Sequence, residues 1–111
     1  MSNANPLFRQ EYIRKNISIR HAQLAEFCRR NHIRKLSLFG SVLRDDFCPD
    51  SDVDMLVEFE PGCVPGFGFI RIERELTTLL NRDVDLNTPR SISKYFRDEV
   101  LDEAEAVYVK A

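Results

Sequence analysis

The sequence predicts a small α+β domain in which a mixed sheet of about three to four strands is covered by helices. Two observations lead to this fold class. Segments with apolar residues at every second position alternate along the chain with segments that repeat at helical spacing. The chain has 111 residues, of which 43% are hydrophobic and 31% are charged, as in an ordinary soluble domain. We therefore expect one domain over residues 18–111, preceded by a weakly helical extension over residues 1–17.

The first half of this domain is expected to contain a helix, a strand and a short helix. Ser18 is a suitable N-cap for a helix that ends near Asn31. Residues 35–39 predict a strand, after which Gly40 and Ser41 turn the chain into a short helix that ends near residue 46. The apolar stripe of the first helix consists of Leu24, Phe27 and Cys28.

The second half is expected to alternate strand and helix. Residues 52–59 predict the strongest strand and residues 83–87 a shorter one, with a helix over residues 69–81 between them. A last helix over residues 92–103 is followed by an edge strand over residues 106–109. The apolar faces of these elements consist of Val53, Met55, Val57 and Phe59, of Phe69, Ile72, Leu76, Leu79 and Leu80, and of Val84 and Leu86.

Composition and charge exclude several classes of protein. No apolar run approaches the roughly 18 residues that a membrane helix needs. The N-terminus lacks the apolar core of a signal peptide and the three cysteines form no C-x-x-C pair, so we expect a reducing cytoplasm. The net charge of −2 speaks against strong nucleic-acid binding through bulk charge. Residues 1–47 hold nine basic and four acidic residues, and residues 48–111 hold seven and fourteen.

Asp52 and Asp54 are the first candidates for chemistry. Residues two apart on a strand point to the same face, so both carboxylates leave the face opposite Val53 and Met55. Two carboxylates this close repel each other, and a divalent cation such as Mg²⁺ is the usual compensation. Taken alone, the pair is more typical of a polar strand end that faces water.

Asp85 is the third candidate. Its neighbours Val84 and Leu86 are expected to be buried, which places Asp85 on the face opposite the core. If its strand lies beside the strand of Asp52 and Asp54, three carboxylates converge and could hold two metal ions, as in phosphoryl-transfer sites. The alternative is an ordinary exposed strand residue.

Gly40, Ser41 and Arg44 form a candidate phosphate site between a strand and a helix. Glycine allows close backbone approach, and the free N–H groups at a helix start favour phosphate. Arg44, expected one turn into the helix, would add a cation. Taken alone, Gly-Ser is more typical of a plain strand–turn–helix with serine as the N-cap.

Two better-known motifs fail on spacing. The segment that begins at Asp50 starts like a calcium-binding EF-hand loop, but its sixth position is Met55 and its twelfth is Pro61, where the loop needs Gly and Glu. The P-loop pattern G-x-x-x-x-G-K-[ST] does not occur.

The run LSLFGSVLRDDFCPDSDVDMLVEF over residues 36–59 resembles the signature of the polymerase-beta-type nucleotidyltransferases, with Gly-Ser followed after ten residues by Asp-x-Asp. The later RDVDLNTP over residues 82–89 is similar to the minimal nucleotidyltransferase (MNT) branch. The resemblance implies the polymerase-beta-like fold over residues 18–109. It also implies transfer of AMP from ATP to a hydroxyl group, with pyrophosphate as the leaving group.

The resemblance assigns roles to the six candidate residues. Gly40, Ser41 and Arg44 would bind the nucleotide. Asp52, Asp54 and Asp85 would be the catalytic residues and would hold two Mg²⁺ ions.

The resemblance also implies a partner. Because one small domain leaves such a site half open, a partner protein or self-association is expected to complete it. In the MNT branch the partner is typically a HEPN-domain toxin, and the small protein is the antitoxin that adenylylates a tyrosine of that toxin.

Two other functions stay open from the sequence. The chain could neutralise a partner by binding alone, since its two oppositely charged halves would steer such an encounter. It could also act on a small molecule or on an RNA end.

Overall fold

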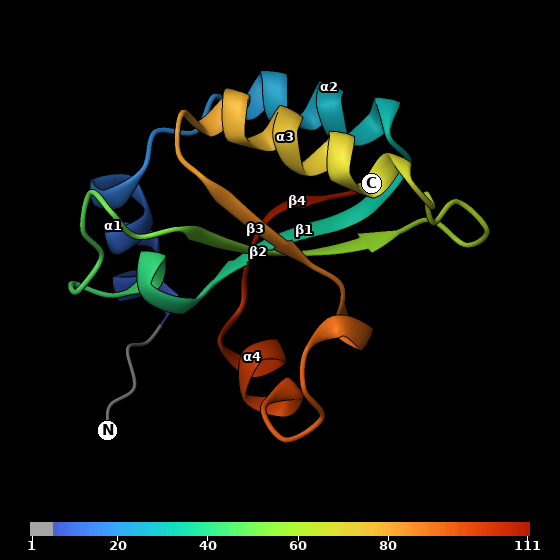
Figure 1. Cartoon of the computed structure of the whole chain (residues 1–111). Helices are drawn as coiled ribbons and strands as arrows, with labels where there is room; N and C mark the ends of the chain where they lie inside the picture. The colour runs from blue at the N-terminus through green and yellow to red at the C-terminus, as the bar shows by residue number, and fades with distance from the viewer. Residues whose placement is uncertain (1–5) are drawn as a thin grey trace.

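The computed structural model describes residues 6–111 and has helices on both faces of one sheet (Figure 1). The helices are α1 (Pro6–Asn16), α2 (His21–Arg30), α3 (Gly68–Leu80) and α4 (Arg97–Glu103), with two short 3-10 helices, η1 (Gly40–Leu43) and η2 (Pro89–Ser91). The strands are β1 (Ile33–Phe39), β2 (Val53–Phe59), β3 (Val84–Asn87) and β4 (Glu105–Val109).

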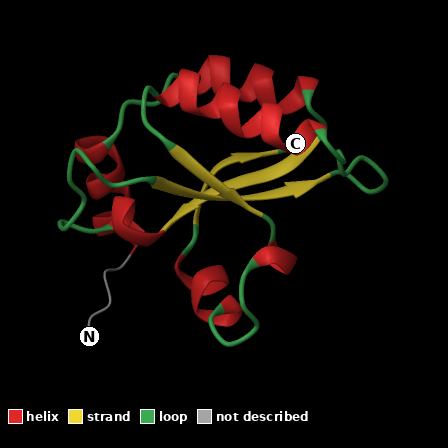
Figure 2. Ribbon diagram, in the orientation of Figure 1, coloured by secondary structure: helices red, strands yellow, loops and turns green. Residues whose placement is uncertain are grey.

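The sheet has the order β3-β2-β1-β4 (Figure 2). β1 runs antiparallel to both β2 and β4, whereas β3 runs parallel to β2. The predicted mixed sheet is therefore confirmed. The strand with the clearest alternation, β2, is an inner strand, and β4 is an edge strand as expected.

The hydrophobic core lies between the sheet and the pair α2 and α3, which cover one face together (Figure 1). Val53, Met55 and Val57 of β2 are fully buried, as their alternation predicts. α4 lies beyond the opposite face, toward which Asp54 and the next alternate residue, Leu56, project. Leu56 is also buried, so this opposite face is not exposed to solvent along its whole length.

Side chains of α3 bind the outer edge of β3. The Thr77 hydroxyl accepts a hydrogen bond from the Val84 N–H at 3.1 Å, and the Glu73 carboxylate accepts one from the Leu86 N–H at 2.8 Å. An edge strand otherwise leaves such N–H groups to water. These two bonds fix the position of β3, and therefore of Asp85, relative to α3 and β2.

The described part of the predicted N-terminal extension forms α1, which packs against the rest of the domain. Ile13 and Ile17 are buried and belong to the core cluster. The Asn16 amide donates to the carbonyl oxygens of Val42 at 2.9 Å and of Arg44 at 3.0 Å. α1 therefore supports η1 directly, which the weak helical pattern of residues 1–17 did not predict. Residues 1–5 of the expected extension lie outside the described residues.

Three predicted helix boundaries were wrong. α2 begins at His21 with Arg20 as the N-cap and no side-chain cap, so Ser18 is not its cap. The helix expected to end near residue 46 is the four-residue η1. α4 begins at Arg97 rather than at residue 92, because the Arg97 guanidinium binds the carbonyl oxygens of Pro89 at 2.8 Å and Ile92 at 3.0 Å and holds the preceding chain in a turn.

No helix within residues 6–111 has the length and apolar character needed to cross a membrane.

Candidate functional site

Asp54 and Asp85 are direct neighbours across the sheet. In the parallel register of β2 and β3, Asp54 is paired with Asp85, and Val53 with Val84. Residues paired in this way project to the same face of a sheet, with adjacent strands about 4.8 Å apart. The strand of Asp85 thus lies beside the strand of Asp54, which the sequence had left open. Asp85 is exposed and Asp54 is half-buried.

Asp52 stands just before β2 and is exposed. The Val53 N–H donates to the Asp83 carbonyl oxygen at 2.8 Å, which fixes the start of β2 against the start of β3. Asp52 therefore lies near the pair of Asp54 and Asp85 without being part of the strand.

The three carboxylates interact electrostatically. Burial, and after it the negative charges of Asp85 and Asp52, raise the pKa of Asp54 from 3.8 to about 6. The Arg44 guanidinium opposes this rise, whereas the Glu103 carboxylate adds to it. The Asp54 side chain therefore lies in a field that disfavours its own charge.

This donor set suits a hard divalent cation, since oxygen ligands with excess negative charge are what Mg²⁺ prefers. Within residues 6–111 the side chains do not already form a closed cage of three or more potential ligands around one point. The structure thus brings the predicted acidic residues into one neighbourhood, while closer convergence would require their side chains to move.

Gly40 is packed against Asp54. Its φ of +79° lies in the left-handed region that favours glycine. A Cβ atom at this position would collide with the Asp54 Oδ2 atom. Glycine is therefore required at residue 40 both by the backbone conformation and by the carboxylate beside it.

The phosphate site that the sequence predicts at the start of a helix lies instead at the short η1, and Arg44 lies outside it. η1 has four residues only, and Arg44 follows it in an extended conformation with φ −133° instead of lying one turn inside a helix. So short a helix has a small dipole, because few peptide units are aligned. The donors of this segment that suit an anion are the Gly40 N–H and the Arg44 guanidinium, both of which already bind a carboxylate of the chain, and Ser41 lies half-buried between them in the sequence.

Both of these groups bind Glu103, a residue that the sequence did not single out. The Gly40 N–H donates to Glu103 Oε2 at 3.0 Å. Arg44 Nη1 donates to Glu103 Oε1 at 3.2 Å. The last residue of α4 therefore reaches the candidate site from the chain's other end.

Arg82 is a second residue that sequence reasoning missed. Its Nη2 atom donates to the carbonyl oxygens of Cys48 and Ser51, each at 2.8 Å, and its guanidinium lies 4.3 Å from the centre of the Phe47 ring. These contacts hold the loop that leads to Asp52. Nothing in the local sequence marks Arg82, since its partners lie 31 or more residues away.

We expect Arg82→Ala to destabilise the fold by about 1–3 kcal/mol, because the Phe47 ring and three backbone carbonyl groups, those of Cys48, Ser51 and, at 3.4 Å, Pro49, lose a charged partner. Urea unfolding measures this change, with Arg74→Ala on the exposed side of α3 as the matched control. Equal stability of the two variants would mean that the loop does not depend on Arg82.

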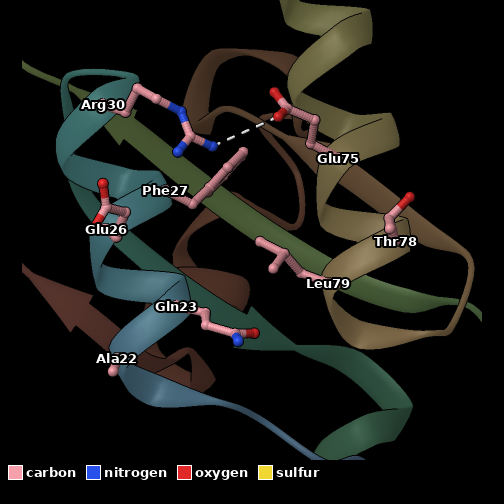
Figure 3. A pocket seen from close by; sticks show the side chains of 8 residues that line it. All are labelled: Ala22, Gln23, Glu26, Phe27, Arg30, Glu75, Thr78 and Leu79. Carbon is pink, nitrogen blue, oxygen red and sulfur yellow. Dashed lines mark ion pairs between the residues drawn. The ribbon is translucent and has the colours of Figure 1, made fainter.

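A groove of about 530 Å³ lies elsewhere, between α2 and α3 (Figure 3). Phe27 and Leu79 line it, and the Arg30–Glu75 ion pair at 3.6 Å spans it. Because residues of α2 and α3 line it, this groove lies on the face of the sheet opposite the one toward which Asp54 and Asp85 project. It therefore contributes nothing to the chemistry of the acidic cluster.

The chain matches a known protein family over most of its length. The family described as polymerase beta nucleotidyltransferase matches residues 22–111, which include all six candidate residues. The chain belongs to the polymerase-beta nucleotidyltransferases. A relative from Thermococcus cleftensis, the protein adenylyltransferase MntA, is 39% identical over 93 residues, which cover 83% of this chain and 90% of the relative.

Two solved toxin–antitoxin structures share the fold of this nucleotidyltransferase. One contains AMP-PNP and matches with a TM-score of 0.66 at 21% identity, covering 83% of this chain and 75% of that chain. The other is a tri-AMPylated HEPN toxin of Shewanella oneidensis in complex with its MNT antitoxin, with a TM-score of 0.59 at 21% identity, covering 88% and 73%. At this identity they establish the nucleotidyltransferase fold.

Proposed function

We propose that this nucleotidyltransferase transfers AMP from ATP to a hydroxyl group of a HEPN-type toxin, with tyrosine as the expected acceptor, and so acts as its antitoxin. The observation that carries the proposal is the pairing of Asp54 with Asp85 beside Gly40. The relative MntA is a protein adenylyltransferase, and an ATP analogue is present in one structural neighbour.

Asp52, Asp54 and Asp85 would hold two Mg²⁺ ions, because their mutual repulsion is what a cation relieves. When bound, Mg²⁺ neutralises phosphate charge and makes the phosphorus atom more electrophilic. The number of ions follows from the family resemblance. The positions of the three carboxylates on and beside β2 and β3 would determine where the Mg²⁺ ions bind.

Gly40, Ser41 and Arg44 would bind the terminal phosphates of ATP. The Gly40 N–H and the Arg44 guanidinium are the donors that suit phosphate oxygens. With the phosphates held there, the α-phosphorus would lie toward the carboxylates. The acceptor oxygen then forms a bond to the α-phosphorus while the bond to the β-phosphate oxygen breaks, and the pyrophosphate stays with these donors until it is released.

The open end of the site suits a protein acceptor. Asp52 and Asp85 are exposed, so a tyrosine on a partner surface could approach the same carboxylates that hold the metal ions. A hydroxyl group must lose its proton during this attack, and either the Asp85 carboxylate or a metal-bound species would accept it.

A non-catalytic antitoxin is the second candidate function. The observation that favours it is the Glu103 carboxylate on the Gly40 N–H and Arg44, since these donors are then bound within the chain. In that case the protein would neutralise its partner by covering a surface.

The test is the intact mass of a HEPN-type partner after incubation with the chain, ATP and Mg²⁺. We expect the partner mass to rise by whole AMP units with the natural chain and to stay unchanged with the Asp52→Asn, Asp54→Asn double variant. Glu26→Gln removes an exposed carboxylate on α2 and is the matched control, which should retain transfer.

Transfer that persists in the double variant would contradict the catalytic role of the two aspartates. Neutralisation of the toxin by the double variant, without any change in mass, would favour the non-catalytic antitoxin. If the partner is neither modified nor bound, the result would favour a small molecule or an RNA end as the acceptor.

A further inference from the structure

Glu103 occupies the two donors on which phosphate binding depends. Its Oε2 atom accepts from the Gly40 N–H at 3.0 Å, and its Oε1 atom accepts from Arg44 Nη1 at 3.2 Å. The two oxygen atoms thus bridge a backbone amide and a guanidinium group, as two oxygen atoms of a phosphate would. The side chain is 32% exposed, so solvent and ligands can reach it.

We propose that Glu103 is an internal competitor for the nucleotide: its carboxylate stands where the terminal phosphates of ATP bind, and the nucleotide must displace it. This inference rests on the proposed function, because it concerns regulation of the same site. The contact is autoinhibitory, since a nucleotide and Glu103 cannot use the Gly40 N–H at the same time.

The charge of Glu103 opposes the nucleotide as well. The carboxylate lies close enough to Asp54 to act on it together with Asp85 and Asp52. A fourth negative charge in this cluster repels a triphosphate and cancels part of the attraction of Arg44. Withdrawal of Glu103 therefore frees two donors and removes one repulsive charge in a single movement.

α4 is built to allow that movement. It has seven residues, and none of them is buried. Leu101 of α4 is 43% exposed, and Phe96 just before the helix is 59% exposed. A helix with so little buried apolar surface has little to lose when it shifts, and a change of the Glu103 rotamer requires even less.

The test is the affinity of the full chain for ATP with Mg²⁺, measured by isothermal titration calorimetry without an acceptor. We expect Glu103→Gln to lower the Kd about tenfold, because the charge that pairs with Arg44 and repels the triphosphate is lost while the side-chain shape is kept. Asp102→Asn removes an exposed carboxylate from the adjacent position of α4 and is the matched control, with an unchanged Kd expected.

A second variant separates competition from general charge. If Glu103 occupies Arg44, Arg44→Ala should weaken ATP binding only slightly in the natural chain and severalfold more in the Glu103→Gln background. Circular dichroism melting of each variant checks that the fold is kept. In the natural chain, an isotope-edited carboxyl carbon signal of Glu103 should shift when ATP and Mg²⁺ are added.

Three other results of these measurements would contradict the proposal. Equal Kd values for the natural chain and Glu103→Gln would show that Glu103 does not compete with the nucleotide, while the proposed function would stand. Weaker binding by Glu103→Gln would make Glu103 a residue that supports the nucleotide. Absence of ATP binding in every variant at millimolar concentration would overturn the proposed function and the competitor together.

Discussion

An Asp54→Asn variant should lose AMP transfer by a factor of at least about 10² to 10³ and yet be more stable than the natural chain in metal-free buffer at pH 7. In the proposed mechanism activity is lost because an amide cannot replace the carboxylate as a ligand of Mg²⁺. Stability is gained because burial disfavours the charge of the Asp54 carboxylate and because Asp85, Asp52 and Glu103 repel it. We expect a gain of about 1–2 kcal/mol after allowance for solvent screening of this partly exposed group.

The same effect has a pH dependence of defined sign. The folded-state pKa of Asp54 is about 6, above the unfolded value of 3.8, so the folded state binds this proton more tightly. The stabilising contribution of the proton is therefore fully present below the unfolded pKa. It is lost as the pH rises through about 6. The stability difference between Asp54→Asn and the natural chain should be near zero at the acidic end and should grow toward neutral pH.

Urea unfolding with EDTA across this pH range measures the difference, and Asp50→Asn, an exposed change in the preceding loop, is the control. Mg²⁺ should reduce the difference at neutral pH, since a bound cation offsets the repulsion. A stability difference that is the same at every pH would show that folding does not raise the pKa of Asp54.

Gly40→Ala should abolish AMP transfer and destabilise the fold by about 2–4 kcal/mol. Part of this comes from backbone strain, because a residue with a Cβ atom at φ +79° costs about 1–2 kcal/mol. The rest comes from the collision of the new methyl group with Asp54 Oδ2, which forces out of place the carboxylate that the proposed mechanism uses.

Gly62 supplies a matched control for this change. Its φ of +78° is nearly the same, but a Cβ atom there would meet nothing within 4 Å. Gly62→Ala should therefore show the strain alone, with transfer unaffected. In an Asp54→Ala background, Gly40→Ala should likewise cost only about as much as Gly62→Ala, because the colliding oxygen atom is absent. Equal effects of the two glycine substitutions in the natural chain would refute the contact.

By itself the sequence determined the strands, the buried face of β2 and the face that carries Asp54 and Asp85. These features follow from the alternation of side chains along one strand, which is a local property of the backbone. The family signature added the spacing between Gly40 and Asp52. Helix ends were predicted less well, because Arg97 binds carbonyl oxygens several residues earlier and sets where α4 begins.

Only the tertiary structure decided which other residues belong to the site. Glu103 is one of several acidic residues on α4, and nothing in its local sequence distinguishes it from Asp98, Glu99 or Asp102. It meets Gly40 across a separation of 63 residues. β4 follows α4 directly and pairs with β1, whose end leads into η1, so that pairing brings the last turn of α4 to Gly40. The physical reason is that side-chain periodicity is encoded within each segment, whereas contacts between segments depend on how the whole sheet is assembled.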